Sequence, residues 1–255
     1  MSRIISIQNL ISVSWKVARN EIAIKYRRSV LGPAWISINM LITIFALGMV
    51  FSNIFGVNTQ DYISYVYCGL LSWGFISSVV LESVTLYING SIKNYNFPVF
   101  FFPLKNTFKN LIISSHNMLL YVILILYLDN NLLNWNILYL LISIPIYILN
   151  SIFISLGIGL IALRFRDLGQ IIINGMYLAF LITPVFWIPN LLVGKKIAIT
   201  DFNPFYYFVE IIREPMLGNT PSLEFYIICA LITVINGFLS YIIFKKNFKN
   251  KAFWI

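Results

Sequence analysis

Six long apolar segments separated by short polar ones dominate the pattern of this chain. They run roughly over residues 34–56, 62–89, 108–128, 136–163, 169–189 and 223–244. Each has about 20 residues or more, which at about 1.5 Å rise per residue is enough to cross the hydrocarbon core of a bilayer. The pattern predicts an all-α polytopic membrane protein with six transmembrane helices, in which residues 1–255 form a single transmembrane domain.

The chain ahead of the first span has the pattern of an amphipathic helix. Apolar and aromatic residues recur there at three- and four-residue steps, at Ile4, Ile7, Ile11, Trp15, Ala18, Ile22 and Tyr26. This spacing predicts an N-terminal helix that lies in the membrane interface, within a cytoplasmic segment 1–32 that ends in a basic elbow. A topology anchor and a substrate-handling role are both open for it. The spans occupy 34–244, and 245–255 form a tail.

Two prolines, Pro98 and Pro103, bracket a short aromatic segment between the second and third spans. Such a pattern predicts one or two helical turns between two breaks. Phenylalanine side chains are unfavourable in water, so lipid, a partner protein or the chain's own helix ends should cover them.

The outer end of the fifth span and the segment that follows it are also punctuated by proline. Pro184 should break the span, and the carbonyl groups that it frees need protein or a wet cavity, so this end should border a pathway. Further on, Asn203 suits a helix N-cap, Pro204 the first helical position and Pro215 a helix stop. The four aromatic residues 205–208 predict that this short helix is re-entrant in the outer leaflet.

The distribution of charge orients the spans. Of the 18 Lys and Arg residues, all but Lys195, Lys196 and Arg213 gather on one side of the membrane when the chain is folded as six spans. By the positive-inside rule that side is cytoplasmic and holds both termini of a multi-pass inner (plasma) membrane protein. The net charge of +9 and its placement at span ends favour anionic lipids, and not nucleic acid, as the counter-charge.

Residues for catalysis are sparse. The only histidine, His116, reads as a hydrogen-bonded packing residue, and the chain offers no converging set of metal ligands. It contains no phosphate-binding G-x-x-x-x-G-K-[ST] sequence, so it should bind no cofactor itself. The intramembrane acid Glu82 should face protein, water or substrate, and its sequence context offers no basic partner.

These motifs occur in one order along the chain. The basic elbow leads into Leu31–Trp35, the Pro98–Pro103 loop follows, the turn Arg166–Asp167 precedes Thr183–Phe186, and Asn203–Phe205 is followed by Arg213. Together they resemble the membrane subunits of ABC-2-type polysaccharide exporters, the Wzm, TagG and KpsM group that moves O-antigen, teichoic acid or capsule. The resemblance covers nearly the whole chain.

The resemblance implies partners that the chain lacks. Such permeases form homodimers with the substrate pathway between the two copies, and they pair with two nucleotide-binding subunits that use ATP and Mg²⁺. The substrate would be an undecaprenyl-diphosphate-linked polysaccharide, with membrane lipids around it. The 93–105 loop would hold the coupling helix that docks on the ATPase, with Lys93, Tyr95, Phe97, Pro98, Phe100, Phe101, Pro103 and Lys105. The helix over 204–214 would help to gate the external exit.

Two sets of side chains suit a lipid-linked glycan. Aromatic rings can stack on the apolar faces of sugars, and the candidates are Tyr62, Tyr65, Trp73, Tyr177, Trp187, Tyr206 and Tyr207, although interfacial aromatic belts explain such residues equally well. Basic side chains can bind a diphosphate, and the candidates are Lys25, Arg27, Arg28 and Arg213.

Two other functions are open at this stage. An ABC-2 permease for drugs or other lipids would share the fold without a glycan-lined path. An integral membrane glycosyltransferase or acyltransferase would need acids or a histidine at a wet interface, and the acids of this chain form no obvious pair.

Overall fold

The computed structural model describes residues 7–32, 34–87, 98–128, 134–165, 167–189 and 200–248, and all regular elements within these ranges are helices. The long helices are α2 (Ala34–Phe55), α3 (Thr59–Thr85), α5 (Phe101–Leu128), α6 (Leu140–Ala162) and α10 (Leu223–Phe248). The shorter ones are α1 (Ile7–Lys25), α7 (Leu168–Ile182) and α9 (Pro204–Met216), with a 3₁₀ turn over Trp135–Tyr139 ahead of α6. The predicted all-α class is confirmed.

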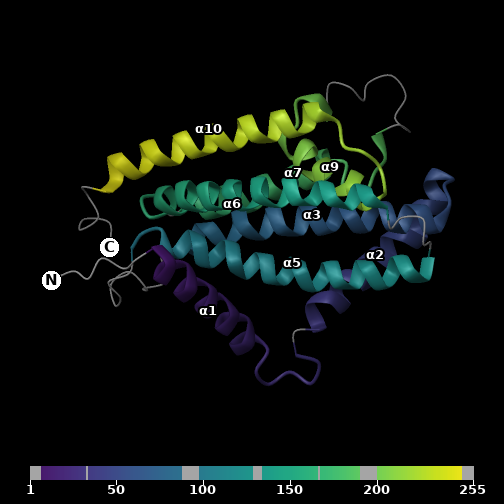
Figure 1. The fold of residues 1–255 in the computed structure, drawn as a ribbon, viewed down its shortest axis with the longest axis horizontal. Helices are drawn as coiled ribbons and strands as arrows, with labels where there is room; N and C mark the ends of the chain where they lie inside the picture. Colours follow the sequence, from purple (N-terminus) through teal and green to yellow (C-terminus); the bar gives the residue numbers. More distant parts are fainter. Residues whose placement is uncertain are drawn as a thin grey trace.

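The helix α3 is the centre of the bundle. In Figure 1, α5, α3, α6 and α10 lie side by side in that order, and α1 splays away from α5. Within its most apolar stretch α3 is 72% buried, whereas the corresponding stretches of α2 and α10 are each 17% buried. The outer helices therefore keep broad apolar faces for lipid or for another protein, and α3 contributes most to the internal core.

Within the described ranges, four segments are long and apolar enough to cross a bilayer. They are Ala34–Phe55, Thr59–Thr85, Trp135–Ala162 and Leu223–Lys246. The helix α7 has only 15 residues, which is about 22 Å and less than a hydrocarbon core of about 30 Å. The helix α5 has 28 residues but is not among the four. The six-span arrangement stays a prediction for these two segments.

The helix α1 packs on the bundle with only part of the predicted apolar face. Ser14, Ala18 and Ile22 are buried, whereas Ile11 and Trp15 are 44 and 45% exposed. Trp15 nevertheless contacts α5, since its ring centre lies 5.5 Å from that of Phe108. The sequence pattern grouped Ile11, Trp15, Ala18 and Ile22 on one apolar face and did not include Ser14, because hydrophobicity alone does not separate a face that meets protein from one that meets lipid.

The break and the short helix near the other end of the bundle follow the prediction closely. The helix α7 ends at Ile182, directly before Thr183–Pro184. Asn203 caps α9, since its side chain accepts a hydrogen bond from the Phe205 amide at 3.0 Å. Pro215 lies in the last turn of α9, and the helix ends one residue after it, at Met216, because proline has no amide hydrogen to donate and its ring crowds the preceding turn.

Candidate functional site

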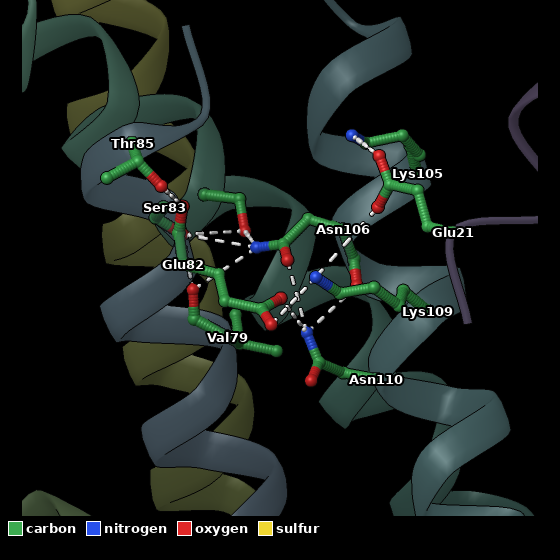
Figure 2. Close-up of polar contacts among 10 residues, drawn as sticks. Glu21, Val79, Glu82, Ser83, Thr85, Lys105, Asn106, Lys109 and Asn110 are labelled. Carbon is green, nitrogen blue, oxygen red and sulfur yellow. Dashed lines mark hydrogen bonds and ion pairs between the residues drawn. The ribbon is translucent and has the colours of Figure 1, made fainter. Parts of the chain in front are cut away.

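Two polar networks lie far apart in the bundle, and the first is an ion-pair ladder formed by Glu21, Lys105, Lys109 and Glu82 (Figure 2). Lys105 pairs with Glu21 of α1. Lys109 lies one turn further along α5, with its Nζ 2.7 Å from the Glu82 carboxylate and 3.9 Å from that of Glu21. The ladder thus joins α1 to α3 through α5.

Amide side chains continue the ladder into the buried core. Asn110 donates to the Glu82 carboxylate at 2.9 Å, and Asn106 donates to the Ser155 hydroxyl of α6 at 3.1 Å and to the Val79 carbonyl at 3.2 Å. The expectation that Glu82 has no basic partner is wrong. Lys109 lies far from it in the sequence and is brought to it only by the packing of α5 on α3.

The aromatic segment at the start of α5 packs mainly on the protein itself. Phe101 and Phe102 are 3 and 2% exposed, and they form a buried cluster with Tyr87 of the α3 end and with α6. Phe100 is 41% exposed, with its ring centre 5.5 Å from that of Phe244 of α10. Of the predicted coupling residues, Pro98 precedes α5, whereas Phe101, Pro103 and Lys105 lie within it, and Lys93, Tyr95 and Phe97 fall outside the described residues.

The second network surrounds Arg213 of α9, whose side chain is fully buried. One of its terminal nitrogens donates to Glu210 and to the Tyr65 hydroxyl, both at 2.8 Å. The other donates to the carbonyls of Pro184 at 2.6 Å and of Val185 at 3.2 Å. The guanidinium also lies 4.0 Å from the centre of the Tyr65 ring. We call these five residues the Arg213 network.

The backbone freed at the break after α7 is therefore bound by protein, one of the two alternatives that the proline pattern predicted. Tyr62 donates to the Phe186 carbonyl, and Tyr65 donates to the Trp187 carbonyl at 3.1 Å. Asn203 adds a bond to the Thr183 hydroxyl at 2.9 Å. Hydrogen bonds from α3 and α9 thus replace the helical bonds that α7 cannot make beyond its end.

The close approach that builds this network depends on Gly69 of α3. A Cβ atom at this position would overlap the Val185 carbonyl oxygen and lie 2.5 Å from a terminal nitrogen of Arg213. Any other residue would push the broken segment or the arginine away from α3. This requirement was not predicted from the sequence, where a single glycine in an apolar helix has no distinguishing signal.

The predicted glycan-stacking residues occupy several environments. Trp73 is 7% exposed and packs on Phe205 with ring centres 5.5 Å apart, and Tyr207 is 9% exposed. Tyr177 is 66% exposed, and Tyr206 and Trp187 are partly buried. Tyr62 and Tyr65 help to line a cavity of about 420 Å³ together with Asn58 and Asp61. A contact between these rings and sugar stays a prediction.

The predicted diphosphate ligands do not form one site. Lys25, Arg27 and Arg28 are exposed around the end of α1. Arg213 is buried among protein groups and contacts Tyr65, which lies about 25 Å along α3 from Glu82 and the ladder. His116 donates from Nδ1 to the Ile112 carbonyl of its own helix, at 2.7 Å.

The fold defines a helical membrane protein with its polar groups at helix contacts, and within the described ranges no group of three His, Cys, Asp or Glu side chains could hold a metal ion. The chain belongs to the ABC-2 type transporter family, whose sequence profile matches residues 14–217. The resemblance inferred from the motifs is thereby confirmed.

Two relatives show which members of this family the chain is similar to. Two O-antigen export system permease proteins RfbA of Klebsiella pneumoniae are 23 and 24% identical to the chain over 237 residues, which cover 90% of each protein. The chain is therefore an ABC-2 permease, a multi-pass transporter subunit of the inner membrane.

Proposed function

We propose that this chain is the membrane subunit of an ATP-driven exporter that moves an undecaprenyl-diphosphate-linked polysaccharide of the O-antigen kind across the inner membrane. The observation that carries the proposal is the alignment with two O-antigen export permeases over 90% of each chain. A match of this extent includes the elbow, the α5 start, the break and α9 together.

The pathway lies between two copies of the chain. The helices α2 and α10 bury little of their apolar surface within one copy, and α7 exposes Ile171, Tyr177 and Leu178. Six helices are a poor wall for a glycan-wide channel, so a closed homodimer satisfies both the geometry and the exposed surface. In this arrangement α9 is the re-entrant helix at the exit, and both chain ends are cytoplasmic.

Energy comes from two separate ATPase subunits that bind ATP and Mg²⁺. They dock at the ladder, where α1 and the start of α5 meet and where Trp15 and Phe100 are 45 and 41% exposed. The ladder couples α1 to α5, because Lys105 and Lys109 both pair with Glu21. The 93–105 loop transmits the motion of the ATPase.

The cargo bears a diphosphate and sugars, for which the chain has matching chemistry. Lys25, Arg27 and Arg28 form an exposed basic group after α1. Replacing Arg27 and Arg28 with Gln reduces export while the protein still inserts in the membrane. Normal surface polysaccharide in that variant would argue against diphosphate binding at this elbow.

One experiment tests the main proposal. A tagged copy of the chain is purified with its partners and assayed for ATPase activity, and the gene is deleted in parallel. Co-purification of an ATPase with accumulation of lipid-linked polymer inside the cell supports the exporter. An ATPase partner without such accumulation indicates another ABC-2 cargo, such as teichoic acid, capsule, a drug or a lipid, and no partner would favour a membrane glycosyltransferase or acyltransferase.

A further inference from the structure

The side chain of Tyr87 connects the end of α3 to the segment just ahead of α5. Tyr87 lies two positions after the last residue of α3 and is 3% exposed. Its hydroxyl donates to the Val99 carbonyl at 3.0 Å. Val99 belongs to the 93–105 loop and lies between Pro98 and the first residue of α5. A side chain at the end of α3 therefore holds the backbone of the predicted coupling segment.

The helix α5 leaves the Val99 carbonyl without its usual donor. In an α-helix a carbonyl accepts from the amide four residues later, and for Val99 this position is Pro103, which has no amide hydrogen. The carbonyls of the two residues that flank Val99 accept from amides of α5, at 2.9 and 3.3 Å. Tyr87 thus supplies the one bond that the proline removes, which gives this proline a partner far away in the fold.

The ring of Tyr87 is fixed by two further contacts. A Cβ atom at Gly159 of α6 would lie 2.7 Å from one ring carbon and 2.8 Å from another, so only glycine lets the ring lie this close to the α6 backbone. The Phe102 ring of α5 packs on it in a T-shaped arrangement, with the ring centres 5.3 Å apart. Tyr87 therefore contacts α5 and α6 at once, and its hydroxyl is held in one position.

The last turn of α3 is bound to α6 as well. Ser83 is fully buried, and its hydroxyl is hydrogen-bonded to that of Ser155 at 3.0 Å. Asn106 of α5 donates to the same Ser155 hydroxyl at 3.1 Å, and Figure 2 shows Asn106 directed toward Ser83. Ser155 and Gly159 are four residues apart on α6, as Ser83 and Tyr87 are along their own segment. The end of α3 is thus attached to α6 at two successive levels.

The Tyr87 contact differs from the ion-pair ladder, which joins the same helices. The ladder uses partly exposed lysines on flexible stems, which can exchange partners. Tyr87 instead meets backbone on two sides, at the Val99 carbonyl and at Gly159. A contact between a rigid ring and backbone does not relax through side-chain rotation, so a displacement of Val99 is passed to the end of α3.

We propose that Tyr87 is the positioning residue that joins the start of α5 to the end of α3, so that a displacement of the segment ahead of α5 reaches α3 and polymer export stays coupled to ATP hydrolysis. The inference rests on the proposed function, since it assigns a step between the ATPase and the pathway. A residue that only packs would affect stability and leave the amount of polymer moved per ATP unchanged. That ratio distinguishes the two roles.

Two tyrosine variants form a matched pair for the test. Tyr87→Phe removes the hydroxyl and keeps the ring beside Gly159 and Phe102. Tyr121→Phe is the control, because Tyr121 is fully buried and its hydroxyl donates to the Met216 carbonyl at 2.6 Å, about 28 Å further along α5 than Phe102. Each variant loses one hydrogen bond from a buried tyrosine to a backbone carbonyl, so the Tm of the purified complex should fall by similar amounts in both.

Coupling is measured in inverted membrane vesicles from cells that make the polymer. After ATP is added, ATP hydrolysis is followed together with the polymer that becomes protected from an added glycosidase, and vesicles from the deletion strain give the background. In Tyr87→Phe, ATP hydrolysis should stay close to the parent rate, and polymer moved per ATP should fall about fivefold, the factor that corresponds to one neutral hydrogen bond. Tyr121→Phe should keep the parent ratio.

A second pair of variants reaches the same contact from α6. Gly159→Ala places a methyl group against the Tyr87 ring and should also lower the polymer moved per ATP. Gly157→Ala is its control, since the new Cβ would lie 3.5 Å from Ser240, at ordinary contact distance. Co-purification of the ATPase is measured for all four variants, so that loss of docking is detected separately.

Each result supports or overturns the inference. A parent-level ratio in Tyr87→Phe would overturn it, and so would an equal fall in Tyr121→Phe, which would trace the loss to stability in general. Hydrolysis and export that fall together at a constant ratio would make Tyr87 a packing residue only. Parent vesicles that hydrolyse ATP and protect no polymer would overturn the proposed function itself, which is a separate failure.

Discussion

The ion-pair ladder and the Arg213 network are both built on α3, and they differ in almost every physical respect. The side chains of the ladder are between 18 and 37% exposed, and its cations are lysines. Arg213 is fully buried and binds two backbone carbonyls, a carboxylate and a tyrosine with one planar group. The first network joins whole helices to each other, and the second holds a piece of irregular backbone in one position.

This difference indicates which network can rearrange. Lysine is a compact charge on a flexible stem, and a half-exposed pair is worth about 0.2–1 kcal/mol, so the ladder can exchange partners at low cost. Arginine fixes several acceptors in one plane, and removing it leaves buried groups without partners. The ladder is therefore suited to transmission of motion, and the Arg213 network to preservation of shape.

The largest expected effect comes from Arg213→Gln. Glu210 and the carbonyls of Pro184 and Val185 lose their partner in a buried site, which should cost about 3–5 kcal/mol. We expect little protein in the membrane and a strongly lowered Tm in detergent. Arg213→Lys should not restore stability, because one ammonium group cannot reach both carbonyls and Tyr65. An unchanged Tm in the Gln variant would mean that the Arg213 network does not stabilise the broken segment.

A smaller effect is expected from Gly69→Ala. The added methyl group overlaps the Val185 carbonyl oxygen and crowds Arg213, and overpacking of this kind costs about 1–3 kcal/mol. The matched control is Gly157→Ala in α6, where the new Cβ would lie 3.5 Å from Ser240, at ordinary contact distance. The Tm of the two variants in the purified complex is compared. Equal values would mean that the α3 approach to the break is not tight.

Tyr65→Phe should have an intermediate effect of about 1.5 kcal/mol, because a hydrogen bond to the charged Arg213 and one to the Trp187 carbonyl are lost together. Tyr177→Phe is the control, since Tyr177 is 66% exposed. Unfolding of both variants is followed by intrinsic fluorescence. A loss that is no greater in Tyr65→Phe than in the control would remove Tyr65 from the network.

The smallest effect on stability is expected in the ladder. Glu82→Gln keeps an acceptor for Asn110 but removes the charge that faces Lys109, which should cost no more than about 1 kcal/mol. A double-mutant cycle with Lys109→Met measures the pair directly, and its coupling energy should shrink as salt is added. A coupling as large as that of the Arg213 network would show that the two networks do not differ in kind.

Local signals predicted much of the fold. The Asn203 cap, the proline break after Ile182 and the long apolar runs each depend on neighbouring residues, and the observed helices begin and end close to them. What failed depends on packing between distant segments. Lys109 meets Glu82 across two helices, and Trp15 meets Phe108 where α1 packs on α5. Neither contact leaves a periodic trace in the sequence.

Some residues of the candidate site could likewise be predicted from the sequence, and others could not. Glu82 and Arg213 could be singled out because a charge in an apolar context is conspicuous, and Pro184 because proline frees carbonyl groups. The role of Gly69 and the contact of Gly159 with Tyr87 could not, since glycine and tyrosine are ordinary components of membrane helices. These residues come together only when the helices that carry them pack against one another.

The helix α3 connects the two networks mechanically. A helix of 27 residues behaves as a stiff rod. The ladder contacts it at Glu82, and the Arg213 network contacts it at Tyr65, about 25 Å away. If α3 slides along its axis or rotates about it, the contacts of both networks change. A displacement of α3 along its axis therefore reaches both the flexible lysines at one end and the buried arginine that binds the break beyond α7 at the other.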